Sequence, residues 1–479
     1  MKKSLVAPII VFVMVSCVFF VSDDSSAVEI TYSNGDALFE YATYGNGNGS
    51  DPYRCTLLSV SDAQETLFIP AALDGHNVTE IAENAMSGLT GVKYIVVPKT
   101  VRTIGDSAFP LDVEAIYFLG DMPSGTIPES KINHSPNAAG WIVGNEFEIL
   151  ESTADDGSSV QGLEISGDAV IIGGKASADK CLTIPSSIDG IKVTSIGGYA
   201  FGAEDIGNNV KTHRTDLETV NVENGVEIIR ERAFFYQGSL VTINIPDSMT
   251  VIMDEAFRSD KSLSNCVLPD SMTSIGFEAF RECKSLTRIV IPDSVTTLND
   301  GSFRLCSGAE SIIIGKGISE IPPNCFGYGS SLKDISFSGK IEKIGGYAFY
   351  FCKSLESFTV PDSVRIIGKA AFDGCDSLTE LRFGDGLELI DSKAFNDCIG
   401  LIEIELPSSV KKVGDDAFWG CSSLTKVVLN SHPDLGSKAF PSETELEYRE
   451  HDDDHSVIII VVIVAIAAIM SVIYIIKRR

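Results

Sequence analysis

The sequence predicts a β-rich solenoid built from 23-residue coils whose strands stack into one parallel sheet. The first observation is a phenylalanine that recurs every 23 residues, at Phe234, Phe257, Phe280, Phe303, Phe326, Phe349, Phe372, Phe395 and Phe418, with Phe440 following after 22. The second is that the residues between them repeat one order: a short strand, a proline-led turn and an apolar return. A fixed period of this length is typical of units that bury their apolar faces only by stacking.

The strand of each coil is read from the unit that begins at Leu286. Ile289 and Ile291 are predicted to point inward and Val290 outward, because successive strand side chains alternate between the two faces. Pro292 ends the strand, and the Asp-Ser pair after it supplies turn chemistry.

The return of each coil begins where Val295 and Leu298 dip back into the core. An Ala-Phe pair then inserts the large ring. Several units place a glycine next to the second apolar residue, which indicates a tight bend or a positive φ; these are Gly276, Gly345, Gly368 and Gly414.

The same unit appears upstream of the main array. Met86 and Phe109 are 23 residues apart, and Phe201 precedes Phe234 by 33 residues, which places a ten-residue insertion near 203–214. That insertion is polar, so we expect a surface loop. The two blocks either form separate arrays or stack into one continuous solenoid, and β-rich lead-ins are expected to cap the first coil of each.

These patterns divide the chain into eight segments. They are a signal peptide (1–27), an N-terminal β cap (28–54), a first repeat block (55–118), a connector with a second cap (119–159), the main repeat array (160–440), an acidic juxtamembrane linker (441–456), a transmembrane helix (457–476) and a cytoplasmic tail (477–479).

Both ends of the chain carry targeting signals. Lys2 and Lys3 precede the apolar run 5–21, and Ser25-Ser26-Ala27 offers a cleavage site, although an uncleaved anchor is the alternative. The uncharged segment 457–476 is long enough to cross a bilayer as a helix. The basic residues 477–479 follow it, so the C-terminus is expected in the cytoplasm and the repeats outside, as in a single-pass cell-surface protein.

Composition narrows the function classes. The 479 residues carry 66 acidic and 37 basic side chains, a formal net charge of −29. Nucleic-acid binding is therefore disfavoured, since no surplus of Lys and Arg exists to neutralise phosphates. No acid–base or nucleophile constellation is found, so an enzyme is not expected, and no cofactor or metal is predicted.

The repeat resembles a known family. The run Val360-Pro-Asp-Ser-Val-Arg-Ile-Ile-Gly-Lys-Ala-Ala-Phe372-Asp-Gly-Cys375-Asp-Ser-Leu378 is similar to the BspA-like (type 5) leucine-rich repeat surface proteins. This resemblance covers roughly 55–118 and 160–440. It implies a leucine-rich-repeat solenoid on the cell surface, and its characterised members are adhesins. Units such as 314–317 lack the proline, and Cys325 replaces the alanine, which indicates variation at turn positions.

Eleven cysteines require a separate interpretation. Six of them stand three residues after the repeat phenylalanine: Cys283, Cys306, Cys352, Cys375, Cys398 and Cys421. Zinc-type spacing is absent because no C-x-x-C occurs. Neighbouring coils would bring these cysteines within disulfide reach, so pairing is one reading, and a column of buried thiols is the favoured one.

Other motifs are weighed against simpler readings. Asp247, Asp270, Asp293 and Asp362 could form a calcium ladder, but turn formation after proline explains them more simply. The segment 451–455 could hold a cation, but it is read as a solvated spacer, and the glycine-rich 45–49 is read as a loop. Sequons expected on loops mark three possible glycosylation sites, Asn48, Asn77 and Asn133.

The exposed face of the strands is the candidate binding site. Its outward positions are Arg288, Val290, Ile313, Asp334, Ser336, Glu380, Arg382, Glu403, Glu405 and Lys426. Such a ladder is the usual binding surface of a solenoid, and the expected partner is an extracellular protein or glycan. The prediction is a cell-surface adhesin. The alternative is a structural component of the cell envelope or surface coat without a dedicated ligand.

Overall fold

The computed structural model describes the chain between residues 27 and 449. The gaps within that range are 34–36, 45–53, 65, 71, 74–75, 99, 111–112, 114, 119–123, 126–131, 134–140, 145–148, 166–167, 203, 207–208 and 212–216. The regular elements of the described residues are β-strands. The chain divides into two compact units, Met1–Gly308 and Ala309–Arg479.

The first unit begins with a block of two sheets. One sheet has the order β1 (Ala27–Ser33), β2 (Leu38–Tyr44), β3 (Arg54–Ser61), β6 (His76–Ile81), β8 (Thr103–Ile104) and β10 (Ser124–Gly125), with β5 (Ala72–Leu73) beside β6. The other has the order β11 (Ile132–Asn133), β12 (Trp141–Gly144), β9 (Ala115–Phe118), β7 (Tyr94–Val97) and β4 (Thr66–Phe68). A buried cluster that includes Phe39, Tyr41 and Met86 fills this block.

The second block of the first unit repeats this plan. Its larger sheet runs β13 (Ile149–Thr153), β14 (Ser159–Ile165), β15 (Asp168–Lys175), β18 (Ile191–Ile196), β22 (Ile228–Ile229), β24 (Val251–Ile252), β26 (Ser274–Ile275) and β28 (Thr297–Leu298), with β17 (Ser187–Ile188) beside β18. Its smaller sheet runs β16 (Cys181–Ile184), β21 (Thr219–Val222), β23 (Thr242–Asn244) and β25 (Asn265–Cys266). The strand β27 (Arg288–Ile291) also belongs to this unit, and β28 follows it in the chain.

Antiparallel strands lead into each block. β1, β2 and β3 pair antiparallel before β3 joins β6 in parallel, and β13, β14 and β15 do the same before β15 joins β18. The edge that the first parallel strand would otherwise expose is covered in this way. The two blocks share no sheet among the described residues, so their strands do not form one continuous ladder.

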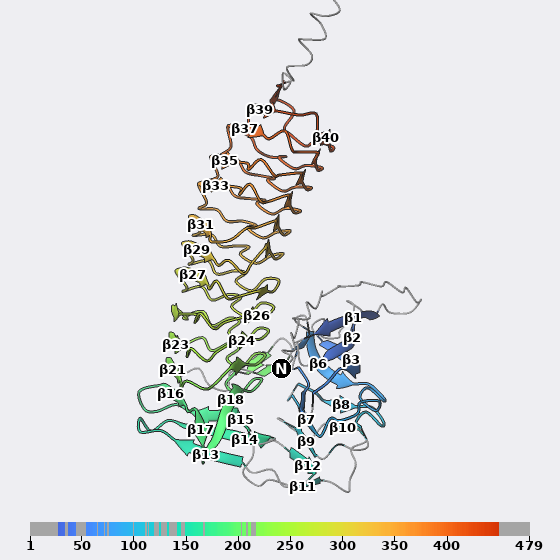
Figure 1. Ribbon diagram of the computed structural model, residues 1–479, viewed down its shortest axis with the longest axis vertical. Helices are drawn as coiled ribbons and strands as arrows, with labels where there is room; N and C mark the ends of the chain where they lie inside the picture. Colours follow the sequence, from blue (N-terminus) through green and yellow to red (C-terminus); the bar gives the residue numbers. More distant parts are fainter. Residues whose placement is uncertain are drawn as a thin grey trace, which may run out of the picture. The chain divides into compact units, whose positions relative to one another are not determined.

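The second unit consists of stacked coils with strands along two edges (Figure 1). One edge carries β29 (Ser311–Ile314), β31 (Asp334–Phe337), β33 (Ser357–Thr359), β35 (Glu380–Arg382), β37 (Glu403–Leu406), β39 (Lys426–Leu429) and β41 (Glu445–Tyr448). The other carries the six-stranded sheet β30 (Glu320–Ile321), β32 (Lys343–Ile344), β34 (Ile366–Ile367), β36 (Leu389–Ile390), β38 (Lys412–Val413) and β40 (Asp434–Leu435).

The expectation of one parallel sheet is therefore wrong, because each coil contributes strands to two sheets. The second sheet arises at the return of the coil, where two residues extend and pair in parallel with the same positions of the next coil. Ile366, for example, pairs with Leu389, and Ile367 with Ile390. The inward residues of this return were identified as core from the sequence, but their pairing was not.

The repeat phenylalanines form a buried stack. Within the second unit, neighbouring rings from Phe326 to Phe440 lie 5.1–5.6 Å apart between centroids and within 19° of parallel. In the first unit the rings from Phe201 to Phe303 stack at 5.0–5.3 Å. Burial of such rings is the main source of cohesion between coils, since each ring contacts the coils before and after it.

Two residues of each coil have a left-handed backbone, and few of them are glycine. They stand two residues before and two residues after the repeat phenylalanine, as Tyr347 (φ 58°) and Phe351 (φ 57°) do around Phe349. The pair reverses the chain tightly enough that the phenylalanine amide donates to the next coil, as Phe349 does to Ala371 at 2.8 Å. The glycine column has another role: a Cβ on Gly276 would lie 2.5 Å from the backbone nitrogen of Asp254, so the missing side chain lets neighbouring coils approach closely, and the positive φ that was one expectation does not occur at Gly276.

Three segments complete the comparison with the sequence. The insertion after Phe201 contains a hairpin of β19 (Glu204–Ile206) and β20 (Asn209–Lys211), where a loop was expected. The apolar segments 5–21 and 457–476 lie outside the described residues. Within the residues that the structure does describe, no helix has the length and apolar character needed to cross a bilayer.

Candidate functional site

The predicted strand face has the expected alternation in the second unit. Outward Asp334, Glu380, Arg382 and Glu403 are exposed, whereas the residues between the outward positions of β35 and β37 are buried. Ser336 and Glu405 are also exposed, and Ile313 and Lys426 are half-buried. The parallel register places Ile313 beside Ser336 and Glu403 beside Lys426. Eight of the ten predicted residues thus lie on the outward side of strands in this unit.

The other two predicted residues, Arg288 and Val290, lie in β27 of the first unit, and both are exposed. Sequence reasoning missed Val267, which occupies the same position one coil earlier and is 73% exposed, against 42% for Val290. These two exposed valines, at equivalent positions 23 residues apart on this unit, are called the apolar strip. The repeat alignment alone could have identified it.

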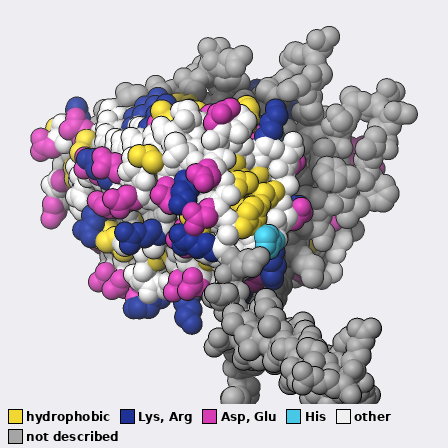
Figure 2. Space-filling view, turned by 90° about the horizontal axis from the view of Figure 1, so that it is seen from above, with side chains coloured by type: hydrophobic (Ala, Val, Ile, Leu, Met, Phe, Trp, Pro, Cys, Tyr) yellow, Lys and Arg dark blue, Asp and Glu magenta, His cyan; other side chains and the backbone are white. Residues whose placement is uncertain are grey.

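In the last coils of the strand face, the charged side chains form ion pairs with one another. Lys426 lies 3.7 Å from Glu403 and 2.7 Å from Glu447, and Arg449 lies 3.1 Å from Glu405. Figure 2 shows acidic and basic side chains side by side on the face it draws, with an apolar patch next to a histidine. In the last coils, His432 stacks on Tyr448, with ring centroids 4.9 Å apart. Exposed ion pairs such as Lys426–Glu447 contribute little to stability, so they mainly reduce the unpaired charge on the strand face.

The turn that carries the repeat phenylalanine presents a second face, which was not predicted. In the first unit this turn face carries an alternating ladder of arginines and glutamates. Arg232 donates to both carboxylate oxygens of Glu255, at 2.8 and 3.0 Å. Arg258 lies 2.8 Å from Glu255 and 3.3 Å from Glu278, and Arg281 lies 2.7 Å from Glu278. The 23-residue spacing of these residues was a visible signal.

Arg232 is the centre of this ladder. It is 1% exposed, and its guanidinium also donates to Asn77 and Tyr199. Burial is the largest influence and opposes its charge, but Glu255 and Tyr199 together outweigh burial and raise the pKa of Arg232. Burial would likewise raise the pKa of Glu255, but Arg232 and Arg258 lower it. Both groups are therefore charged across the physiological range, and each depends on the other.

The turn face of the second unit is aromatic. Tyr350 packs edge-on against Tyr328 and Tyr347, with ring centroids 5.2 and 5.4 Å apart, and it lies 4.6 Å from Phe351. All four rings are half-buried.

Acidic side chains continue this face beyond the rings. Asn396 donates to Asp373 at 3.0 Å and to Asp397 at 2.9 Å, so one amide bridges the two carboxylates. Burial, and then Asp397, raise the pKa of Asp373, which Asn396 opposes.

The repeats of this chain match a known protein family. The family described as BspA type leucine-rich repeat region matches in six copies, over residues 70–114, 180–264, 204–329, 250–364 and 342–458. These segments span more than half of the chain. The chain belongs to this family. Its repeats are a non-catalytic scaffold, and its members are cell-surface proteins that typically bind other proteins.

Solved structures of leucine-rich repeat proteins are similar to the chain. A leucine-rich repeat protein from Bacteroides ovatus is 21% identical over 63% of this chain and 98% of its own, with a TM-score of 0.32. A leucine-rich cell-surface protein from Faecalibacterium prausnitzii is 21% identical over 64% and 97%, with a TM-score of 0.36. The pneumococcal vaccine antigen PcpA is 19% identical over 64% and 89%, with a TM-score of 0.40. No curated protein matches the sequence.

The ten cysteines that the structure describes are free thiols. They include the six that form the periodic cysteine column of the BspA-type repeats. The favoured reading is therefore confirmed. Each of the six periodic thiols donates to the carbonyl of the phenylalanine one coil earlier, at 3.1–3.5 Å. Burial raises the pKa of Cys306 and Cys421 to about 12, so these thiols stay protonated and act as hydrogen-bond donors.

Three coils between Phe234 and Phe418 lack this cysteine, and one of them has Gly329 in its place. Gln237 takes its place in another coil and donates to the Phe201 carbonyl. Asp260 takes its place in the next, with no exposed surface. One of its oxygens accepts from the backbone N–H of Gln237 at 2.7 Å, and the other has no hydrogen-bond partner in the described structure. Burial raises the pKa of Asp260 well above its usual value. Asp260 thus occupies the place of the thiol, and its burial disfavours the charged form.

The remaining candidate motifs of the sequence do not form metal sites in the described residues, where no cluster of three potential ligands occurs. The Asp-Ser turns follow the simpler reading. Ser271 and Ser294, for example, donate to the preceding coil at 2.6 Å.

The three sequons fare differently from one another. Asn48 and the segment 451–455 lie outside the described residues. Asn133 lies in β11, not in a loop. The expectation for Asn77 is wrong, because Asn77 lies in β6 and is 3% exposed, so a glycosylating enzyme could not reach its amide in the folded chain.

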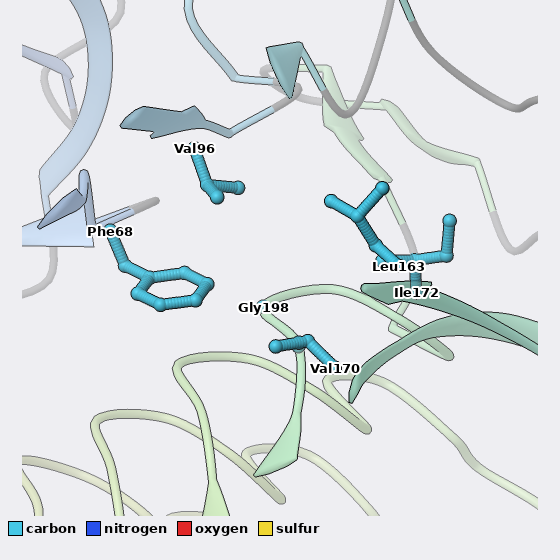
Figure 3. Close-up of a pocket in the computed structure, with 7 residues that line it drawn as sticks. Phe68, Val96, Leu163, Val170, Ile172 and Gly198 are labelled. Carbon is cyan, nitrogen blue, oxygen red and sulfur yellow. The ribbon is translucent and has the colours of Figure 1, made fainter. Parts of the chain in front are cut away.

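A small cavity lies where the two blocks of the first unit meet. Phe68 and Val96 of the first block face Leu163, Val170 and Ile172 of the second (Figure 3). Its volume is about 10 Å³, which is at the lower limit for one water molecule. It is therefore a joint between apolar surfaces and has no room for a ligand.

Proposed function

We propose that this BspA-type protein is a cell-surface adhesin that binds an extracellular protein through its outward strand face. The observation that carries the proposal is a group of exposed charged residues on that face, Asp334, Glu380 and Arg382. They have no ion-pair partner within 4 Å in the described part of the chain, unlike the paired last coils. Unpaired charges on a rigid sheet favour association with a complementary surface.

The apolar strip on the first unit supports the same proposal. Val267 and Val290 are exposed on strand-face positions, and Arg288 lies in the same strand as Val290. Interfaces usually combine apolar contacts with a charged rim, and Arg is enriched at their centres. These residues therefore supply a second contact for a protein partner.

Anchoring at the cell surface is part of the proposal. Its support is the basic start and apolar run of 1–27 and the uncharged segment 457–476 with basic residues after it. Protease treatment of intact cells should digest the repeats and leave a short membrane-protected fragment. Protection of the repeats would contradict this topology.

The binding test uses the purified full chain in detergent, immobilised and screened against extracellular proteins from cells that share its habitat. We expect saturable binding of a protein ligand. Exchange of charges in Glu380→Lys/Arg382→Glu keeps the net charge and should weaken that binding at least tenfold. Lys412→Glu is the matched control, since Lys412 is exposed on the other sheet, and it should bind normally.

The outcomes separate the two candidate roles. Binding that is unchanged by the Glu380/Arg382 exchange would show that another surface is used. Failure to bind any protein or glycan would favour the alternative, a structural component of the cell envelope or surface coat.

A further inference from the structure

The turn face of the second unit carries a patch that is separate from the strand face. The turn-face patch consists of the half-buried rings of Tyr328, Tyr347, Tyr350 and Phe351 and the carboxylates of Asp373 and Asp397. Burial raises the pKa of Tyr350, and the charge of Asp373 raises it further, which reflects how close the carboxylate lies to the phenol.

The patch has no cation of its own against the carboxylates. Neither Asp373 nor Asp397 has an ion-pair partner within 4 Å in the part of the chain that the structure describes. Lys353 lies over the Phe351 ring at 5.1 Å, but it pairs with Asp376 at 3.0 Å. Lys393 acts on Asp373 only weakly, as the last of the influences on its pKa. The Asn396 amide is the one hydrogen-bond donor that both carboxylates share.

The first unit shows how the same repeat positions are used when a cation is present. Phe235 stands at the position of Tyr350, five coils earlier. Arg232 and Arg258 lie 5.0 and 5.9 Å from the centre of its ring, and both also bind the carboxylate of Glu255. A guanidinium is thus held between an aromatic face and a carboxylate, an arrangement that both cation–π attraction and charge-assisted hydrogen bonds favour.

The second unit keeps the ring and the negative charge but lacks the arginine. The position of Arg258 is occupied by Asp373, that of Arg232 by Tyr347, and that of Glu282 by Asp397. We propose that the turn-face patch binds arginine side chains of a basic segment in a partner protein. The partner's guanidinium would lie against the ring of Tyr350 or Phe351. It would donate hydrogen bonds to the carboxylates of Asp373 and Asp397.

Charge and shape favour this occupant. The chain carries a net charge of −29, which attracts basic segments over a distance. Planar guanidinium stacks on aromatic rings and donates in pairs to carboxylates, whereas ammonium acts as a point charge. Arginine should therefore bind better than lysine. The proposal does not rest on the strand-face function, because the two surfaces share no residue.

The experiment measures binding of fluorescent eight-residue peptides to the purified full chain at physiological salt. The probes alternate glycine with arginine, with lysine or with citrulline, the uncharged analogue of arginine. We expect the arginine peptide to bind about tenfold or more tighter than the citrulline peptide. Tyr350→Leu/Phe351→Leu should weaken it about five- to thirtyfold, the range that loss of cation–π contacts gives.

Matched variants separate local binding from general attraction. Asp373→Asn/Asp397→Asn should weaken the arginine peptide at least tenfold. Glu342→Gln/Glu356→Gln, which removes two charges from exposed positions elsewhere in the same unit, should change it less than twofold. Tyr350→Phe keeps the ring and the fold, so it should retain binding. Equal losses in the two acid variants would overturn the proposal by showing only net-charge attraction.

Two further results would also overturn it. Unchanged binding in the folded Leu variant would mean that the rings are not used. If the Leu variant does not fold, the two acid variants alone decide the outcome. Binding of a glycan that the Leu variant loses, together with no difference between the arginine and citrulline peptides, would assign the patch to a sugar. Loss of strand-face binding in Glu380→Lys/Arg382→Glu without loss of peptide binding would leave this proposal intact.

Discussion

The turn faces of the two units use the same repeat positions with opposite chemistry. The first unit fills them with Arg232, Glu255, Arg258 and Glu278, which bind one another. The second fills them with aromatic rings and with the carboxylates of Asp373 and Asp397, which have no ion-pair partner among the residues that the structure describes. The backbone is the same in both, down to the left-handed residues on either side of the phenylalanine. The difference therefore comes from side chains alone.

This contrast separates positions that hold the coil together from positions that are available for other uses. The phenylalanine stack and the backbone hydrogen bonds between neighbouring coils occur in both units. The turn-face side chains do not have to take part in that cohesion. Where they do, as in the first unit, their removal should destabilise the fold; where they do not, it should change only the surface.

The largest expected effect is on the buried ladder. Glu255→Ala would leave Arg232 charged, 1% exposed and without its carboxylate. Breaking one partner of a buried pair costs about 3–5 kcal/mol. Urea denaturation of the variant should show a decrease of this size in the free energy of unfolding. Hydrogen exchange of the backbone amides should locate the decrease in the coils of the first unit.

Asp397→Ala in the second unit is the matched variant. Its carboxylate is exposed and has no ion pair in the described residues, so the expected change is within about 0.5 kcal/mol. Similar losses in the two variants would remove the distinction between the two faces.

The next effect depends on pH and concerns Asp260, which stands where later coils have a thiol. Burial raises its pKa in the folded chain, whereas the unfolded value is about 3.9. Between that value and the folded pKa, the unfolded chain binds fewer protons than the native one, so this group lowers the free energy of unfolding by up to about 1.4 kcal/mol for each pH unit. Its stabilisation is complete below about pH 4 and is lost as pH rises.

Asp260→Cys installs the side chain that the repeat uses elsewhere and isolates this effect. The difference in urea midpoint between the variant and the natural chain should grow in favour of the variant from pH 4 to pH 8. A difference that does not change with pH would mean that Asp260 ionises in the folded chain as readily as in the unfolded one.

A smaller effect is expected for the thiol column. Cys421→Ala removes the donor to the Phe395 carbonyl, a bond of 3.1 Å, and should cost about 1–2 kcal/mol. Cys421→Ser keeps a donor and should cost less. A reducing agent should change neither protein, because the described cysteines are free. A stability decrease with reductant would reveal a disulfide and contradict the thiol column.

The smallest effects should have opposite signs in the two units. Asp416 has a left-handed backbone with φ of 55°, so Asp416→Gly should stabilise the second unit by up to about 1 kcal/mol. Glu278 also has a left-handed backbone, with φ of 48°, so Glu278→Gly relieves the same backbone strain. It also removes the ion pairs with Arg258 and Arg281, so it should destabilise the first unit. Thermal melts compare the two. Two stabilising substitutions would show that the ladder contributes nothing.

The sequence allowed the period, the inward residues and the outward strand positions to be predicted, because a strand alternates and a repeat phenylalanine must be buried. It did not reveal the second sheet, since Ile366-Ile367 and its equivalents are only two residues long. Nor did it reveal the left-handed residues, because glutamate, tyrosine and lysine occupy them where glycine would be expected. The alternating Arg258 and Glu278 ladder could have been found by aligning coils beyond the phenylalanine.

The hydrogen bonds that the thiols donate all point in one direction along the array. This direction affects how such arrays can change in length. Each of the six periodic cysteines donates backward to the coil before it, and phenylalanine amides such as those of Phe349 and Phe372 donate forward to the coil after them. A whole coil can therefore be duplicated or removed by recombination within the gene, and the coils on either side still find the same donor and acceptor. Lineages can vary the reach of the protein in steps of one coil, without having to evolve a new junction each time.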